Sequence, residues 1–398
     1  MPEVWITGVG AVTAAGIGAD ALERLLLHEE SAVEARGPDG PALARTPTPP
    51  RRPATRRLDR SALLFFTAGE EAWRDAGLDA TPWCRDRALV LEGSPVGPIG
   101  ELLDGASRDR SPSPAALIRF MIGAGGAALA QTLGIEGGAL HLSAASVSSA
   151  CAIGEGYLKV AAGLADLALV GGGESPLHPA IVQAFAAAGI LAPGDGGPLP
   201  CRPFDPARCG TVLGEGAGAL VLESAEHAAR RGARPRAVLA GFSLSGEAHG
   251  MTSPDPSGRG VRRAASQALG DTPCDRLGWI KTHGTGTPLN DAAECRGLAA
   301  LLGDALPRIP LTSLKPALGH CLGASTAVET VAAVLALARG FVPATLGTAR
   351  VDPALPPCTV ALRRAAASAP VLVLAESFGG RCAALLLRAA SPASRDRS

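Results

Sequence analysis

The sequence is poor in aromatic residues and carries no net charge. Aromatic residues make up only 3% of its 398 residues, and 37 Lys and Arg balance 37 Asp and Glu. This balance gives no electrostatic reason to expect nucleic acid or an anionic membrane as a partner. No apolar run reaches the ~18–20 residues that span a bilayer. Residues 1–6 lack the basic segment of a signal peptide, so we expect a cytoplasmic protein.

The cysteines show no metal-binding or disulfide pattern. There are nine, an odd number, and no two form a Cys-x-x-Cys pair. This scatter argues against a disulfide framework and against a zinc site. No Gly-x-Ser-x-Gly motif is present either, which argues against a serine hydrolase of that type. We expect no metal and no tightly bound cofactor.

Strand and helix patterns alternate along the chain. We predict strands at 4–10, 88–92, 140–142, 167–170, 220–223, 237–242, 279–282, 309–313 and 371–375, and helices at 20–27, 59–76, 115–133, 150–162, 291–302 and 323–338. Three glycines are expected to close the strand at 167–170, and 107–114 is expected to be a polar loop. Such alternation favours a mainly parallel sheet covered by helices. Two successive sets of similar order suggest two half-domains, at 1–230 and 231–398.

Residues 140–175 contain the best candidate for a nucleophile site. A short apolar strand enters a cluster of Ala and Ser, and an amphipathic helix and a buried strand follow. In α/β enzymes this order holds a nucleophile at a helix N-terminus, where unpaired N–H groups favour negative charge. The two candidate nucleophiles are Ser146 and Cys151.

This stretch resembles the nucleophile region of the β-ketoacyl-acyl-carrier-protein synthases, the condensing enzymes of fatty-acid and polyketide assembly. That family typically has Thr-Ala-Cys-Ala-Ser-Gly followed by Ile-Gly-Glu and later Gly-Gly. Here Ile-Gly-Glu at 153–155 and Gly-Gly at 171–172 fall at family spacing, and counting back places Ser146 at the nucleophile position. Ala-Cys-Ala at 150–152 also resembles the motif, but choosing Cys151 requires the deletion of five residues.

Three further blocks extend the resemblance over nearly the whole chain. They are Phe-Asp through Gly-Glu-Gly-Ala-Gly at 204–218, Thr-His-Gly-Thr-Gly-Thr-Pro-Leu-Asn-Asp at 282–291, and Ser-Leu-Lys-Pro-Ala-Leu-Gly-His at 313–320. The resemblance implies an α/β, thiolase-like fold in which two duplicated βα half-domains form an αβαβα layered sandwich.

The resemblance also implies a role for the two histidine motifs. His283 and His320 would donate hydrogen bonds to a malonyl thioester oxygen as enolate charge develops on it. Lys315, with Glu329, would hold His320 and its local charges in place. A cationic lysine also helps to keep a neighbouring imidazole neutral.

The resemblance assigns the remaining site residues to support, access and gating. Asp291 would support the site, and Thr285 and Thr287 would line the tunnel for the phosphopantetheine arm of an acyl carrier protein, although both are equally typical of turns. Phe378 and Gly379 would form the gate and the oxyanion hole. This last block is shorter than the family's Asn-Ser-Phe-Gly-Phe-Gly-Gly, and Cys382 replaces an Asn after it.

A serine at the nucleophile position changes the expected activity. A helix N-terminus lowers a cysteine pKa from ~8.5 into the physiological range, whereas a serine needs a general base. We therefore expect no condensation by this chain alone. One interpretation is a chain-length-factor-type subunit of a heterodimer with a cysteine-bearing ketosynthase. The others are a serine-dependent acyltransferase or decarboxylase, and an ordinary synthase in which Ser146 is an engineered change. The chain is expected to form a homodimer or a heterodimer, and its partner is expected to be an acyl carrier protein.

Overall fold

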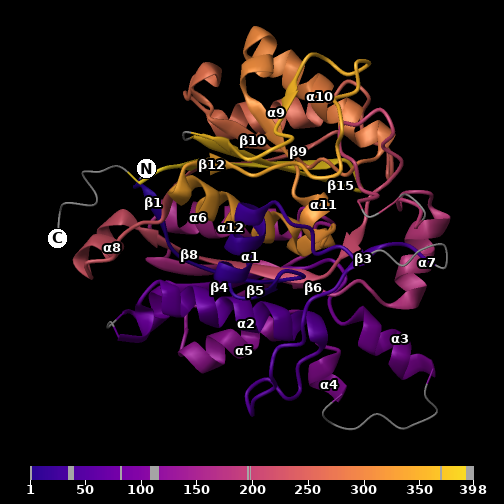
Figure 1. The fold of residues 1–398 in the computed structure, drawn as a ribbon. Helices are drawn as coiled ribbons and strands as arrows, with labels where there is room; N and C mark the ends of the chain where they lie inside the picture. Colours follow the sequence, from indigo (N-terminus) through magenta and orange to yellow (C-terminus); the bar gives the residue numbers. More distant parts are fainter. Residues whose placement is uncertain are drawn as a thin grey trace.

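Two β-sheets alternate with three layers of helices (Figure 1). The computed structural model describes residues 2–34, 40–80, 83–107, 116–194, 197, 199–367 and 370–390. The first sheet has the strand order β5-β4-β6-β8-β1. Its strands are β1 (Val4–Thr13), β4 (Ala88–Gly93), β5 (Ala139–Leu142), β6 (Leu167–Glu174) and β8 (Gly216–Ser224).

The second sheet repeats this topology. Its order is β11-β10-β15-β16-β9, and the short β13 (Thr359–Val360) continues it beyond β11. In each sheet the first three strands of the order are parallel and the last two pairings are antiparallel. The strands are β9 (Ala237–Gly246), β10 (Trp279–Lys281), β11 (Pro310–Thr312), β15 (Val371–Ser377) and β16 (Arg381–Arg388). The structure therefore confirms the expected duplicated, layered α/β fold.

The two sheets are joined at one edge. Val4 of β1 pairs antiparallel with Leu239 of β9, so the strands form one continuous hydrogen-bonded path. The half-domain boundary expected at 230/231 falls in the connection between α8 (Ala225–Arg230) and β9.

Helices α6 (Ser148–Ala161) and α12 (Ser325–Arg339) lie between the two sheets (Figure 1). Ile153 and Val160 of α6 share one core cluster with Val331 of α12. Among the described residues, one segment, Leu322–Arg339, is long and apolar enough to cross a membrane, contrary to the expectation from sequence. Because 83% of it is buried inside the molecule, it is the central core helix of this fold.

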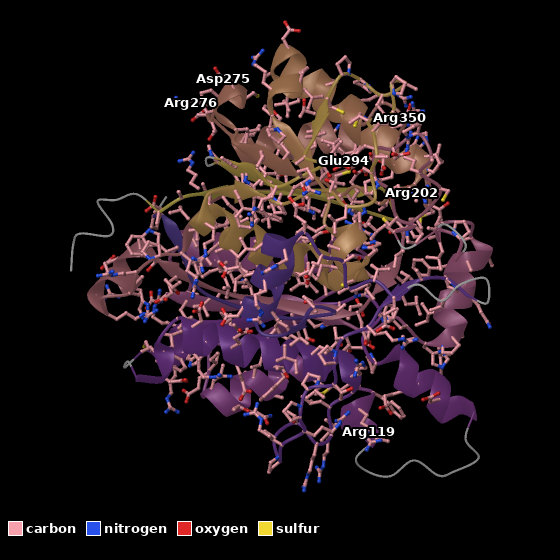
Figure 2. All side chains as sticks on the ribbon, viewed as in Figure 1. Arg119, Arg202, Asp275, Arg276, Glu294 and Arg350 are labelled. Atoms are coloured by element: carbon pink, nitrogen blue, oxygen red, sulfur yellow. The ribbon has the colours of Figure 1, made fainter. Side chains whose placement is uncertain are left out.

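The outer faces of the sheets are covered by other helices (Figure 1). α2 (Arg60–Asp75) and α5 (Ala124–Leu133) cover the first sheet, and α9 (Arg259–Leu269) and α10 (Pro288–Leu302) cover the second. Charged side chains extend outward from these layers, whereas Glu294 of α10 lies inside (Figure 2). The remaining longer helices are α1 (Ala19–His28), α3 (Ile99–Ser107) and α7 (Pro179–Ala187).

Two local expectations are wrong, and a third lies mostly outside the described residues. The helix expected at 115–133 is broken into α4 (Ala116–Arg119) and α5, because Gly123 adopts a left-handed φ of 79°. The glycines at 171–173 do not close β6, which continues through them to Glu174. Ser107 ends α3, and the rest of the loop expected at 107–114 lies outside the described residues.

Candidate active site

Ser146 lies in a tight turn between β5 and α6. Ala145, before it, has a left-handed φ of 52°, which costs an L-residue about 1–2 kcal/mol. The Ser148 hydroxyl holds this turn: it donates to the Ala145 carbonyl at 2.7 Å and accepts from the Ala144 amide at 2.8 Å. Gly93 allows β4 to approach, because a Cβ there would lie 2.4 Å from the Ser148 carbonyl oxygen. The backbone of this turn therefore fixes the position from which the Ser146 side chain extends.

The structure brings Ser146, and not Cys151, to the histidines. Ser146 Oγ lies 3.3 Å from His320 Nε2. Cys151 is one turn further along α6, only 9% exposed, in an apolar cluster with Ala375 and Ala383. Burial raises the pKa of the Cys151 thiol, which disfavours its thiolate.

The two imidazoles lie edge to face. The ring centroids of His283 and His320 are 5.4 Å apart at an interplanar angle of 84°. Burial and the Lys315 charge hold the pKa of both imidazoles well below the usual value, so both are neutral near pH 7. His320 Nδ1 lies 2.9 Å from Ser325 Oγ, while His283 Nδ1 is buried and has no hydrogen-bond partner in the described part of the chain.

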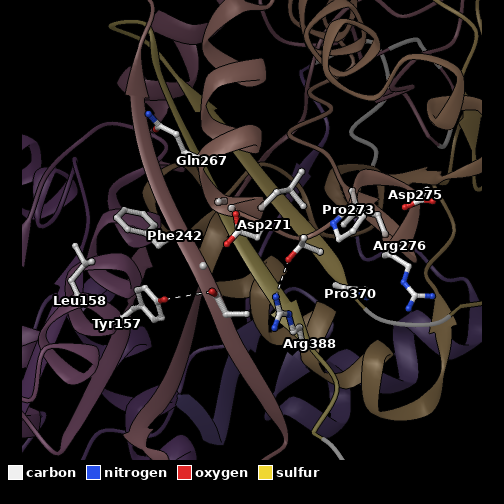
Figure 3. Close-up of a pocket in the computed structure, with 17 residues that line it drawn as sticks. Tyr157, Leu158, Phe242, Gln267, Asp271, Pro273, Asp275, Arg276, Pro370 and Arg388 are labelled. Atoms are coloured by element: carbon white, nitrogen blue, oxygen red, sulfur yellow. Dashed lines mark hydrogen bonds between the residues drawn. The ribbon is translucent and has the colours of Figure 1, made fainter. Parts of the chain in front are cut away.

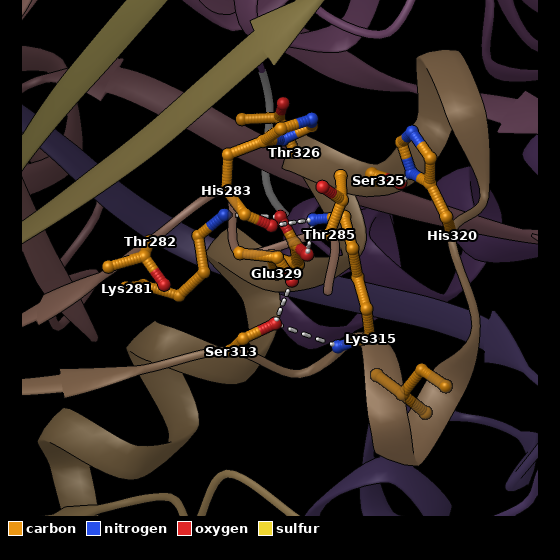
Figure 4. A network of polar contacts seen from close by, with 12 residues as sticks. Lys281, Thr282, His283, Thr285, Ser313, Lys315, His320, Ser325, Thr326 and Glu329 are labelled. Carbon is orange, nitrogen blue, oxygen red and sulfur yellow. Dashed lines mark hydrogen bonds and ion pairs between the residues drawn. The ribbon is translucent and has the colours of Figure 1, made fainter. Parts of the chain in front are cut away.

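A buried ionic network lies beneath the rings (Figure 4). Glu329 of α12 pairs with Lys315 at 3.0 Å through one oxygen and with Lys281 through the other. Lys315 also donates to the His283 carbonyl, and Lys281 donates to the Leu374 carbonyl at 2.7 Å. Burial lowers the pKa of Lys281 to about 8, against the attraction of Glu329. Lys315 thus bonds to the His283 backbone and acts on His320 through its charge, and its expected role in holding His320 in place stays a prediction.

Two acidic residues of α10 shape the loop that carries His283. Glu294 accepts from the His283 amide at 2.6 Å and from the Gly284 amide at 2.9 Å. Asp291 accepts from the Gly286 amide at 3.1 Å and from the Phe204 amide at 2.8 Å. Asp291 therefore holds the backbone of this loop, and its supporting role in catalysis stays a prediction.

Comparison with known proteins agrees with this geometry. The family model "Beta-ketoacyl synthase, N-terminal domain" matches residues 48–228, and its C-terminal counterpart matches 236–349. The chain belongs to the β-ketoacyl synthase family. It is 34% identical over 378 residues to a putative polyketide beta-ketoacyl synthase 1 of Streptomyces halstedii. The aligned region makes up 88% of this chain and 89% of the relative.

Solved structures of similar fold include complexes. The ishigamide ketosynthase/chain length factor superposes with a TM-score of 0.88 at 28% identity, over 98% of this chain and 100% of the other. A second match is a chain from a type II polyketide synthase complex, in which an acyl-carrier protein is bound to its ketosynthase. It has the same TM-score and the same coverage, at 26% identity.

The other site residues of this synthase-family chain lie in a loop and a turn. Thr285 and Thr287 lie in the loop before α10, where their hydroxyls are 2.8 Å apart, and their tunnel role stays a prediction. The Gly379 amide donates to the Met251 carbonyl at 2.7 Å. That amide is therefore engaged and does not contribute to an oxyanion hole in this structure. Phe378, 43% exposed, keeps its gating role as a prediction.

Sequence reasoning missed Lys281 and Glu294. A sequence signal existed for Lys281: it is a charged residue in a short apolar strand, two positions before His283. Glu294 lies in the expected helix but gave no signal, because its role is to accept from backbone amides.

Two surface cavities lie away from this site. One, of 920 Å³, is bordered by Tyr157, Phe242, Asp271 and Arg388, with a hydrogen bond from Arg388 to Thr272 across it (Figure 3). A smaller one, of 250 Å³, is lined by Arg60 and Glu215 among others. Neither is lined by Ser146 or the histidine pair.

Proposed function

We propose that this chain is a non-condensing subunit of a ketosynthase, of the chain-length-factor type, that works beside a cysteine-bearing partner on thioesters of an acyl carrier protein. The observation that carries the proposal is a hydroxyl, Ser146 Oγ, facing His320 Nε2 at 3.3 Å. A condensing enzyme of this family needs a thiolate at that point. The thiol nearest in sequence, Cys151, is buried among apolar side chains.

The surroundings of His320 argue against a serine nucleophile. In a Ser-His-Asp triad a carboxylate on the far ring nitrogen stabilises the imidazolium that forms when the serine loses its proton. Here the far nitrogen, Nδ1, meets the neutral hydroxyl of Ser325. Burial and Lys315 lower the pKa of His320 further, so its charged form is disfavoured. His320 is therefore a poor base for Ser146, which makes a serine-dependent acyltransferase the weaker interpretation.

The edge of the first sheet supports an association with another chain. β5 is the outermost strand of that sheet, and Leu140 on it is 51% exposed. An open strand edge presents unpaired backbone groups that another strand can complete. β5 ends four residues before Ser146, so a subunit bound there would lie beside the Ser146 turn. The similarity to a ketosynthase/chain length factor agrees with this arrangement.

The direct test combines activity and mass spectrometry. The purified chain, incubated with acyl- and malonyl-carrier protein, should yield no β-ketoacyl product and no covalent acyl adduct. Mixing it with a cysteine-bearing homologue from the same source should give a stable complex that forms product. An adduct on Ser146 would instead favour the acyltransferase, and one on Cys151, with elongation that survives Ser146→Ala, would overturn the assignment.

A second activity, decarboxylation of the malonyl thioester, is favoured by the intact histidine pair. In that step the bond to the carboxylate carbon breaks, CO2 leaves, and its electron pair moves to the thioester as an enolate. Hydrogen bonds from neutral His283 and His320 would stabilise the enolate oxygen until water returns a proton to carbon. The step needs no thiolate. Release of CO2 with formation of acetyl-carrier protein by the isolated chain would support it.

A further inference from the structure

Three buried side chains with metal-ligand chemistry meet on the outer face of the second sheet. Glu376 lies near the end of β15, Cys382 on β16, and Glu247 directly after β9. One carboxylate oxygen of each glutamate and the Cys382 sulfur lie within 4.8 Å of one another. The exposed fractions of these residues are 5% or less. None of the three takes part in the histidine site.

The sheet register brings these side chains together. Glu376 and Cys382 are direct partners in the antiparallel β15–β16 ladder, so their side chains leave the same face. Glu247 is anchored twice: its amide donates to the Gly380 carbonyl at 2.8 Å, and its Oε2 accepts from the Asp255 amide at 2.8 Å. Its other oxygen, Oε1, lies 3.7 Å from Cys382 Sγ.

The Arg259 guanidinium lies beside the cluster, where it donates to the Glu247 backbone carbonyl at 2.7 Å and pairs with Asp255. Among the residues that the structure describes, no Lys or Arg forms an ion pair with the carboxylate of Glu247 or Glu376. Glu376 Oε1 is buried and finds no hydrogen-bond partner within the described ranges. Burial and the neighbouring acids, Glu294 first, raise the pKa of Glu376, and burial raises the pKa of Cys382. Two buried acids and a thiol whose carboxylates have no paired cation among the described residues are costly unless a metal ion or protons compensate them.

We propose that Glu247, Glu376 and Cys382 bind one divalent transition-metal ion, with Zn²⁺ as the preferred ion. Zn²⁺ takes thiolate and carboxylate ligands in tetrahedral geometry, with Zn–S and Zn–O distances of about 2.3 and 2.1 Å. In tetrahedral geometry these bond lengths separate the S and O ligands by about 3.6 Å, close to the 3.7 Å between Cys382 Sγ and Glu247 Oε1. Binding releases the thiol proton to solvent, and a water completes the fourth position.

The position of this site gives it a consequence for the gate. Glu376 and Cys382 flank the turn that carries Phe378, and Glu247 is bonded to that turn at Gly380. An ion held by all three would fix the base of the turn to the β9–α9 loop. Gly260 of α9 closes the site, because a Cβ there would lie 2.6 Å from Cys382 Sγ. This proposal departs from our expectation of no metal. That expectation rested on the spacing of cysteines in the sequence, which does not reveal donors that three separate strands bring together.

The test is metal binding by the full chain. After chelator treatment, the protein should bind one equivalent of Zn²⁺ by calorimetry, and Co²⁺ should give a thiolate-to-cobalt charge-transfer absorption. Cys382→Ala should abolish that absorption. Both Cys382→Ala and Glu376→Gln should weaken Zn²⁺ binding more than about tenfold.

Cys295→Ala is the matched control, since Cys295 is a buried thiol beside Cys358. It should leave binding unchanged, and Zn²⁺ binding lost in that variant would assign the ion to the other cysteine pair. If Cys382→Ala fails to fold, Glu376→Gln with a native circular dichroism spectrum decides. Absence of stoichiometric binding, or binding unaffected by both cluster variants, would overturn the proposal and leave an acid cluster compensated by protons.

Discussion

Each half of the molecule brings polar groups to the turn before its middle-layer helix, but the second half adds charged groups from other elements, such as Lys281 of β10. In each half, a helix of the middle layer follows the third strand of the repeat, α6 after β5 and α12 after β11. In the first half, the polar side chains of this described turn are hydroxyls, among them Ser146 and Ser148, and neutral hydrogen bonds hold the turn. The second half buries two ammonium groups and a carboxylate beneath its imidazoles.

This difference shows that the residue at the nucleophile position is independent of the groups that set the protonation of the histidines. The charge environment of the histidines is produced almost entirely by the second half, through Lys281, Lys315 and Glu329. Ser146 contributes one hydroxyl and no charge. The group at the nucleophile position can therefore change without altering the protonation of the imidazoles.

Ser146→Cys is expected to give the largest effect, because it restores a thiol in the first half while the second half is unchanged. Acyl loading at position 146 should go from undetectable to stoichiometric, since a thiol at a helix N-terminus forms a thiolate and an alcohol does not. Intact-protein mass spectrometry after incubation with acyl-carrier protein measures it. Full condensation by this variant without any partner would favour an ordinary synthase with an altered serine over a partner subunit.

The matched control is Cys151→Ser in the Ser146→Cys background. The buried Cys151 faces Ala375 and Ala383, so its removal should leave acyl loading unchanged. Loss of loading in the double variant alone would mean that Cys151 carries the acyl group.

Glu329→Gln breaks the ionic network of the second half. Two buried ammonium groups would lose their shared counter-charge, and the free energy of unfolding should fall by about 3–5 kcal/mol. Urea titration followed by circular dichroism measures the change. Glu155→Gln, at the half-exposed pair with Lys159 on α6, is the control and should cost less than about 1 kcal/mol. Equal effects of the two variants would contradict a buried network.

His283→Ala and His320→Ala test the hydrogen-bond donors. Each should lower malonyl decarboxylation by about 10²–10³-fold, the usual effect of removing one donor to a developing oxyanion. Ser146→Ala should leave the rate within a factor of a few, because the step needs no nucleophile. A rate that depends on Ser146 as strongly as on the histidines would show that the serine takes part.

The pH dependence of stability should be the smallest effect. The folded-state pKa of His283 lies well below its unfolded value of about 6.5. Below that pH the unfolded chain binds a proton that the folded chain does not, so stability falls as the pH is lowered from 6.5. His283→Gln should reduce this slope between pH 6.5 and 5 by about 1 kcal/mol per pH unit, measured by urea unfolding. An unchanged slope would indicate a charged imidazole in the folded state.

The sequence predicted the fold class and the meeting of Ser146 with His320 because both depend on motif spacing and βα alternation. It did not predict the break at Gly123, where local backbone conformation overrides an apolar pattern. It also missed β16, and with it the pairing of Glu376 with Cys382. Side-chain partners such as Lys281 and Glu329 are 48 residues apart, so only the three-dimensional arrangement reveals them.

The pairing of β1 with β9 has a consequence for folding. An edge strand of each half pairs with an edge strand of the other, and both halves pack against the same central pair of helices. If either half were expressed separately, the unpaired backbone groups of one strand edge and an apolar helix face would be exposed to water. The molecule should therefore melt as a single unit, and a backbone cut near residue 232 should leave two fragments that remain bound.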